Sequence, residues 1–243
     1  MSDEGHSSRF IFPRWANYAL PAIAVAVIGG AMYMPVAVGL GFSPKTTAVG
    51  YAPQQPVPYS HAMHAGKLGL DCRYCHSTVE KAAFAAIPTT QVCMNCHSVV
   101  HNQPGKESPR LKPVFESWKS GKPVEWTKVH DLPDYAYFNH SIHVNQGVGC
   151  VSCHGRIDRM DVVQQEAPLN MGWCLECHRD PAKNLRPREE ITNMGWKATD
   201  HPDVKQKNIT DPDEAQKFLG GELMKKYGIR NQAYMTSCFT CHR

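Results

Sequence analysis

The sequence lacks the long amphipathic segments from which most chains of 243 residues build an apolar core. Its mean hydropathy is −0.41, even though one apolar run near the start raises the average. A chain that buries so little apolar surface needs another stabilising interaction to offset the conformational entropy that it loses on folding. We therefore predict mostly coil with short helices and little strand, around an interior that bound groups supply.

No cysteine lies outside one repeated motif, Cys-x-x-Cys-His, and no copy of the motif has another residue in place of its histidine. The five copies occupy residues 72–76, 93–97, 150–154, 174–178 and 238–242. At this spacing two cysteines attach a haem through thioether bonds, and the histidine that follows binds one face of the iron. We therefore predict five covalently attached haem c groups.

Under this prediction every cysteine is an attachment point: Cys72, Cys75, Cys93, Cys96, Cys150, Cys153, Cys174, Cys177, Cys238 and Cys241. The proximal iron ligands are His76, His97, His154, His178 and His242. Two other uses of the cysteines are weaker. Disulfides between cysteines two residues apart are redox motifs, not scaffolding. Zinc ribbons share the spacing of the first two pairs and of the third and fourth, but the fifth pair has no partner, and zinc does not require the histidines.

Histidines also recur outside these motifs, in a pattern that occurs twice. Residues 59–64 read Tyr-Ser-His-x-x-His, residues 138–143 read Phe-Asn-His-x-x-His, and each stretch precedes two cysteine motifs. Self-similarity in a fixed order indicates an internal duplication. We predict two dihaem modules, residues 59–110 and 135–182, separated by a connector, residues 111–134. The predicted distal iron ligands are His61, His64, His140 and His143.

A fifth distal ligand is still needed. We favour His130, because a proline-pinned turn in Val-His-Asp-Leu-Pro can direct its side chain. His101, His201 and Met171 are the alternatives, and the choice matters because methionine raises a haem potential relative to histidine. Between residues 102 and 134 the sequence has little apolar periodicity, so we expect an ordered connector there.

The fifth motif lies in a C-terminal segment, residues 183–243. Within it, Asp211 followed by Pro212 is typical of a helix start, with the acid as N-cap and the proline in the first turn. We expect this helix to be interrupted near the glycine pair at 220–221 and to end at Gly228.

Charged residues are absent from Trp15 to Pro44. This apolar run exceeds the h-region of a typical signal peptide, which is the alternative interpretation, and it is long enough to cross a bilayer, which takes about 20 residues. We predict a single-pass anchor at residues 15–42, after a cytoplasmic tail, residues 1–14, and before a proline-rich spacer, residues 43–58. Since c-type haems are attached outside the energy-conserving membrane, we place the haem domain on the periplasmic side of a bacterial inner membrane.

Two strong-field ligands on each iron leave no open coordination position, and such haems transfer electrons without binding substrate. We therefore expect no catalytic residues and a role as a membrane-anchored electron relay. The formal charge of +4 does not indicate a nucleic-acid partner. Five haems bring about ten propionates, so the assembled surface can be acidic and steer redox partners instead.

The His-x-x-His stretches followed by Cys-x-x-Cys-His resemble the cytochrome c3/c7 group. In that group the first histidine usually serves the haem directly following, which implies that His61 pairs with His76 and His140 with His154. Over residues 10–243 the pattern is closer to the pentahaem cytochrome c subunit of alternative complex III, a bacterial quinol oxidoreductase. The stretches that carry this resemblance are residues 130–134, 138–143 and 170–179 and the terminal motif.

The second resemblance implies electron transfer from quinol oxidation, in a respiratory or photosynthetic complex, to a periplasmic cytochrome c, cupredoxin or oxidase. It also implies an iron–sulfur subunit and a multi-span membrane subunit as partners, with lipid around the anchor and no nucleic acid. The alternative is a stand-alone quinol dehydrogenase resembling the NapC/NrfH cytochromes, which the long spacer before the first motif disfavours. A catalytic multihaem reductase is a third possibility, and it requires a five-coordinate iron.

Overall fold

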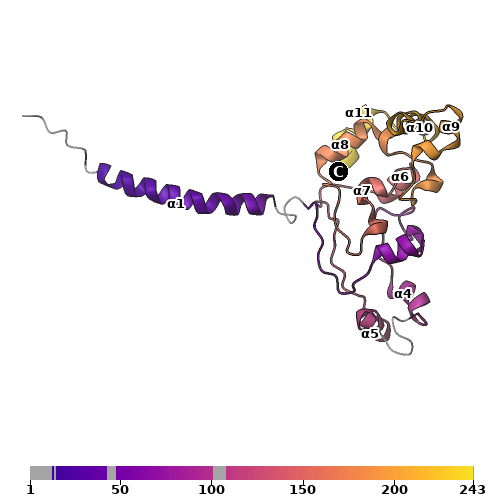
Figure 1. Cartoon of the computed structure of the whole chain (residues 1–243), viewed down its shortest axis with the longest axis horizontal. Coiled ribbons are helices and arrows are strands. Elements are labelled where there is room, and N and C mark those ends of the chain that lie inside the picture. Colours follow the sequence, from indigo (N-terminus) through magenta and orange to yellow (C-terminus); the bar gives the residue numbers. More distant parts are fainter. Residues whose placement is uncertain (1–12, 14, 43–47, 101–107, 243) are drawn as a thin grey trace, which may run out of the picture. The chain divides into compact units, whose positions relative to one another are not determined.

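The computed structural model describes residues 13, 15–42, 48–100 and 108–242. The chain divides into two units, Met1–Ala48 and Val49–Arg243 (Figure 1). Most of the predicted tail, residues 43–47 of the predicted spacer and the alternative ligand His101 lie outside the described residues.

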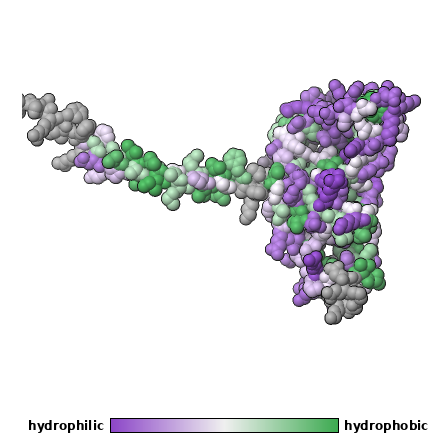
Figure 2. Space-filling view, in the orientation of Figure 1, coloured by the Kyte–Doolittle hydropathy of each residue, from purple (hydrophilic) through white to green (hydrophobic). Residues whose placement is uncertain are grey.

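The first unit contains one long helix, α1, Ala16–Gly41. None of its residues is buried, and Figure 2 shows hydrophobic side chains along much of its visible face. At 1.5 Å per residue the helix is roughly 39 Å long, more than the hydrocarbon core of a bilayer. By length and apolar composition the helix can therefore cross a membrane.

The second unit consists of short helices joined by coil, as predicted (Figure 1). Among the described residues the only β pairing is one antiparallel bridge between Val148 and Leu185. The π-helix η1 is Ala62–Lys67, and the 3₁₀ helices are η2 Pro109–Leu111, η3 Ile157–Arg159, η4 Pro181–Asn184, η5 Arg188–Glu190 and η6 Ala198–Asp200. The α-helices are α3 Cys72–Cys75, α4 Thr90–His97, α5 Lys112–Ser120, α6 His140–Asn145, α7 Val151–His154, α8 Met171–Arg179, α9 Pro202–Gln206, α10 Pro212–Lys226, α11 Gln232–Met235 and α12 Cys238–Cys241.

The larger apolar cluster of this unit forms around α10. The Asp211 carboxylate accepts a hydrogen bond from the Glu214 amide at 2.8 Å and caps the helix, as the sequence predicts. The predicted interruption at the glycine pair is wrong, because α10 continues through both glycines. A β-carbon at Gly220 would overlap the Ala182 carbonyl oxygen, so this glycine allows close packing and does not break the helix. The buried members of the cluster are Leu185, Ala198, Val204, Ala215, Leu219 and Leu223.

A smaller apolar cluster forms around α5, inside the predicted connector. The expectation of little apolar periodicity there is wrong: Val114 and Phe115 are buried on one side of α5, and the helix ends at Gly121, whose φ is +71°. Glycine suits this left-handed position because it has no β-carbon. The cluster also includes Met94, from within the second cysteine motif. The connector therefore supports that motif directly.

Candidate haem-binding sites

Each Cys-x-x-Cys-His motif coincides with a short helix: α3, α4, α7, α8 or α12. In three motifs the amide of the histidine donates to the carbonyl of the first cysteine: His76 to Cys72 at 2.8 Å, His154 to Cys150 at 3.0 Å and His242 to Cys238 at 2.8 Å. This single helical turn places both thiols and the imidazole on one compact segment.

All ten cysteines are free thiols, so the structure gives no support to the disulfide alternative. The structure does not support the zinc alternative either. Within the described ranges, no group of three or more His, Cys, Asp or Glu side chains is arranged to hold a metal ion. Ten thiols in five separate pairs, each followed by a histidine, fit the donor set of a c-type haem.

Four of the five predicted proximal histidines are held in the same way, by a hydrogen bond from Nδ1 to a backbone carbonyl. Because a carbonyl can only accept, Nδ1 must carry the proton, and the lone pair of the neutral ring lies on Nε2. Metal-binding histidines are typically oriented by a bond of this kind. The bonds are His76 to Ala86 at 2.9 Å, His97 to Val100 at 3.0 Å, His178 to Met235 at 2.8 Å and His242 to Tyr135 at 2.9 Å.

Three of the predicted distal histidines are oriented by the same kind of bond. Nδ1 of His64 donates to Ser60, that of His140 to Ala83 and that of His143 to Asn139, each over 2.8 Å. His64 and His143 occupy equivalent positions in the two repeated stretches, and both bond to the carbonyl four residues earlier. The seven Nδ1–carbonyl bonds thus prepare both classes of histidine to bind metal through Nε2.

One aromatic ring in each repeated stretch packs against both of its histidines. Tyr59 stacks on His64 at 4.4 Å between ring centroids and meets His61 edge-on at 4.8 Å. Phe138 does the same, stacking on His143 at 4.5 Å and meeting His140 edge-on at 4.7 Å. The duplication seen in the sequence is therefore also a duplication of side-chain geometry.

Two of the histidine pairs have the separation expected across one metal atom. The ring centroids of His64 and His97 are 6.2 Å apart, and those of His143 and His178 are also 6.2 Å apart. Two imidazoles bound at about 2 Å on opposite sides of a metal have centroids roughly 6 Å apart. In both copies, the second histidine of the repeated stretch thus faces the histidine of the second cysteine motif.

The first and third motifs meet in a partly buried group of five imidazoles: His61, His76, His130, His140 and His154. Burial, and then the neighbouring His130, lower the pKa of His154 to about 3. Burial, followed by the nearby His76, lowers the pKa of His61 to about 4. Both rings are therefore neutral near pH 7, the form in which histidine binds metal.

Three ring nitrogens in this group are buried without a hydrogen-bond partner: Nδ1 of His61, Nε2 of His130 and Nδ1 of His154. Leaving such an atom unpaired costs about 1–3 kcal/mol, so an orphaned ring nitrogen indicates a site for something that binds there. Of the three atoms, Nε2 of His130 is of the kind that the other rings leave free for metal, whereas Nδ1 of His61 and Nδ1 of His154 lack the orienting carbonyl bond that seven other rings make.

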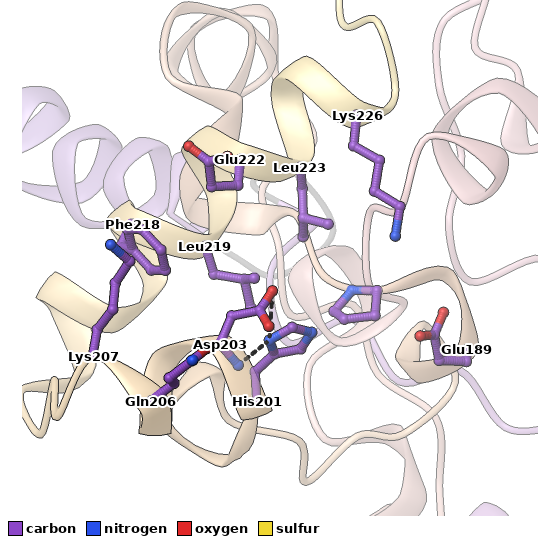
Figure 3. A pocket seen from close by; sticks show the side chains of 11 residues that line it. Glu189, His201, Asp203, Gln206, Lys207, Phe218, Leu219, Glu222, Leu223 and Lys226 are labelled. Carbon is purple, nitrogen blue, oxygen red and sulfur yellow. Dashed lines mark hydrogen bonds and ion pairs between the residues drawn. The ribbon is translucent and has the colours of Figure 1, made fainter.

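His130, our predicted fifth distal ligand, lies in this group beside the third motif. Its ring centroid is 4.6 Å from that of His154. Met171, an alternative, begins α8 and is 64% exposed. His201, another alternative, accepts a hydrogen bond from the Asp203 amide at 3.3 Å. His201 also lines a surface pocket of about 490 Å³ between α9 and α10, to which no cysteine motif contributes (Figure 3).

The C-terminal motif is seated on the segment that precedes the second repeated stretch. The Tyr137 amide donates to the Cys241 carbonyl at 2.8 Å, and the Tyr135 ring lies 6.0 Å from that of His242. The sequence does not predict that this segment contacts the C-terminal motif, because the residues in contact are more than 100 positions apart and leave no local pattern.

Comparison with known proteins supports the general class. No family model matches the chain. The chain is 29% identical over 190 residues to "Menaquinone reductase, multiheme cytochrome c subunit" of Nitratidesulfovibrio vulgaris, an alignment that covers 78% of this chain and 77% of the relative. This similarity supports a multihaem cytochrome c linked to quinone chemistry.

Proposed function

We propose that this chain is a membrane-anchored pentahaem cytochrome c, the electron-transfer subunit of a quinone-linked complex. The observation that carries the proposal is the pair of 6.2 Å separations, His64–His97 and His143–His178, each beside a pair of free thiols. A haem attached through two cysteines and bound by one imidazole on each face of its iron uses this set of residues.

In this proposal the ten cysteines attach the haems, and the five motif histidines are proximal ligands. The proposed distal ligands are His61, His64, His130, His140 and His143. The two dihaem modules and the pairing of each distal with each proximal histidine belong to the same proposal. Haem iron supplies one-electron redox chemistry when bound. The chain's own part is to hold neutral imidazoles with Nε2 free, to occupy both axial positions and thereby to exclude substrate from the metal.

We place the haem domain outside a bacterial inner membrane, with α1 as its anchor. The complex we propose resembles alternative complex III, with iron–sulfur and multi-span membrane subunits as partners. Electrons would then pass from quinol oxidation to a periplasmic acceptor. The name of the relative favours a second candidate, the opposite direction, in which electrons from the periplasm reach menaquinone.

Purification of the tagged chain from its native membranes in mild detergent tests this function. We expect five haems per chain by the alkaline pyridine assay, a low-spin spectrum and several co-purifying membrane subunits. Quinol-dependent reduction of an added cytochrome c would favour the first direction, and menaquinone reduction by a periplasmic donor the second. Fewer than five haems per chain would overturn the proposal. Quinol oxidation by the chain without partners would favour a stand-alone dehydrogenase instead.

A further inference from the structure

We infer that the five cysteine motifs lie in single file in an order that differs from the sequence: second, first, third, fourth, fifth. The inference rests on the proposed function, since it concerns the haems held at these motifs. It makes the second and fifth haem sites the two ends of the electron path, and it places the first motif of the chain in the interior.

The second motif contacts the first. Asn95, between the two cysteines of the second motif, donates a hydrogen bond from Nδ2 to the hydroxyl of Tyr74 at 3.1 Å. Tyr74 occupies the equivalent position between the cysteines of the first motif. On another side, the second motif inserts Met94 into the apolar cluster of α5. The element that bounds it there is thus a helix of the connector and not another motif.

The first motif contacts the third across the boundary between the two copies. The side chains of Cys72 and Cys150 lie close enough to interact with each other. Asp71, which caps the helix of the first motif, accepts from the Thr192 hydroxyl at 2.9 Å. The adjacent Ile191 carbonyl accepts from the Cys150 amide at 3.0 Å. One short segment therefore joins the starts of both motifs.

The histidine stretch of each copy is also hydrogen-bonded to the backbone of the other copy. The accepting residue lies just after the first cysteine motif of that other copy. The amide and Nδ1 of His140 both donate to the Ala83 carbonyl, at 3.1 and 2.8 Å. In the reverse sense, the Ala62 amide donates to the Met160 carbonyl at 3.0 Å. A β-carbon at Gly66 would overlap the Asp158 carbonyl oxygen, so the two backbones approach closely there. This reciprocal seating fixes the first and third motifs as neighbours.

The third motif contacts the fourth through Asn184. The Asn184 carbonyl accepts from the Gly149 amide at 3.4 Å, and its side-chain amide donates to the Cys177 thiol at 3.3 Å. The fourth motif contacts the fifth where Nδ1 of His178 donates to the Met235 carbonyl, three residues before Cys238. Figure 1 agrees with this order: α4 lies toward one end of the second unit, α8 and α11 toward the other, and α7 between them.

The test compares two variants of the holoprotein, each lacking one haem: Cys72→Ala/Cys75→Ala and Cys93→Ala/Cys96→Ala. Electrostatic interaction between two haems weakens with distance, so removing one haem changes the midpoint potentials of its immediate neighbours most. We expect removal of the first haem to shift two of the remaining four potentials, and removal of the second to shift one. Potentiometry followed by NMR or optical spectroscopy gives these potentials directly.

If the haems instead follow the sequence, the numbers are reversed: one potential shifts on losing the first haem and two on losing the second. That result would overturn the order and leave the proposed function intact, whereas a wild-type count below five haems would overturn the function. Should either variant fail to mature, cryo-electron microscopy of the intact complex gives the same answer. An iron at His97 lying between those at His76 and His154 would refute the inference.

Discussion

Single imidazoles show how the protein prepares its ligands. A histidine that donates from Nδ1 to a carbonyl keeps the Nε2 lone pair free, and seven rings here are held in this way. Four of these carbonyls belong to residues ten or more positions away along the chain. Ligand orientation thus depends on the fold and not on the side chain alone.

His64→Ala removes one of these rings from the pair that faces His97. We expect one of the five haems to become high-spin, because water is a weaker axial ligand than imidazole. Electron paramagnetic resonance and the optical spectrum measure the high-spin fraction. His201→Ala is the matched control, since that ring lies in the α9–α10 pocket, and it should stay fully low-spin. A low-spin spectrum in the His64 variant would exclude this residue as a ligand.

Asp71 is the second residue whose role can be tested alone. Hydrogen bonds from Arg73 lower the pKa of the Asp71 carboxyl to about 2. A carboxyl with a lowered folded-state pKa stabilises the protein above its unfolded pKa, and this stabilisation is lost as the pH falls toward 2. We expect Asp71→Ala to cost about 1 kcal/mol at pH 7, the usual value of a helix cap.

Denaturant unfolding at several pH values checks the Asp71 prediction. The difference in unfolding free energy between the wild type and the variant should shrink as the pH falls from 4 to 2. Asp180→Asn, which breaks an exposed ion pair with Lys183, is the control and should change stability little. A difference that does not vary with pH would contradict the assigned cause.

At the scale of elements, the two adjacent glycines in α10 differ in role: one allows close packing against backbone, and the other does not. Gly220 is buried against the Ala182 carbonyl, whereas a β-carbon at Gly221 would have no atom within 4 Å. Glycine lowers helix propensity at either position, which is why the sequence predicts an interruption. The packing around Leu219 and Leu223 holds the helix together despite that preference.

The pair Gly220→Ala and Gly221→Ala tests this difference on neighbouring residues. We expect Gly220→Ala to destabilise the protein by about 1–3 kcal/mol, because the methyl group overlaps backbone that cannot move aside easily. Gly221→Ala should instead stabilise it by about 0.5–1 kcal/mol through higher helix propensity. Thermal or denaturant unfolding measures both. Equal effects at the two positions would mean that propensity alone governs them.

At the scale of the molecule, the sequence predicts what is local and misses what is not. The long apolar helix α1 and the Asp211 cap each depend on a few adjacent residues, and each matches the structure. The amphipathic character of α5 was missed because the helix has only nine residues, and of its three buried positions only Val114 and Phe115 are apolar. The contacts between motifs, such as Tyr74 with Asn95, are pairings across the chain that no local pattern encodes.

Removal of α1 tests the division into two units. Because Val49–Arg243 forms a unit of its own, we expect a chain that starts at residue 49, exported behind a cleavable signal, to be water-soluble. Its haem content and low-spin spectrum should equal those of the full chain. Fractionation of the periplasm and membranes without detergent measures the outcome. A truncated chain that stays with the membranes would show that residues beyond α1 also bind there.

The reciprocal seating of the two histidine stretches has a consequence for how such a chain can mature. Ala83 supports a histidine of the later copy, and Met160 supports the stretch that opens the earlier one. Each half contains one facing histidine pair of its own, His64–His97 or His143–His178, but its histidine stretch is fully held only when the other half has folded. A gene split between the copies would yield two fragments whose first motifs are completed only when the fragments associate.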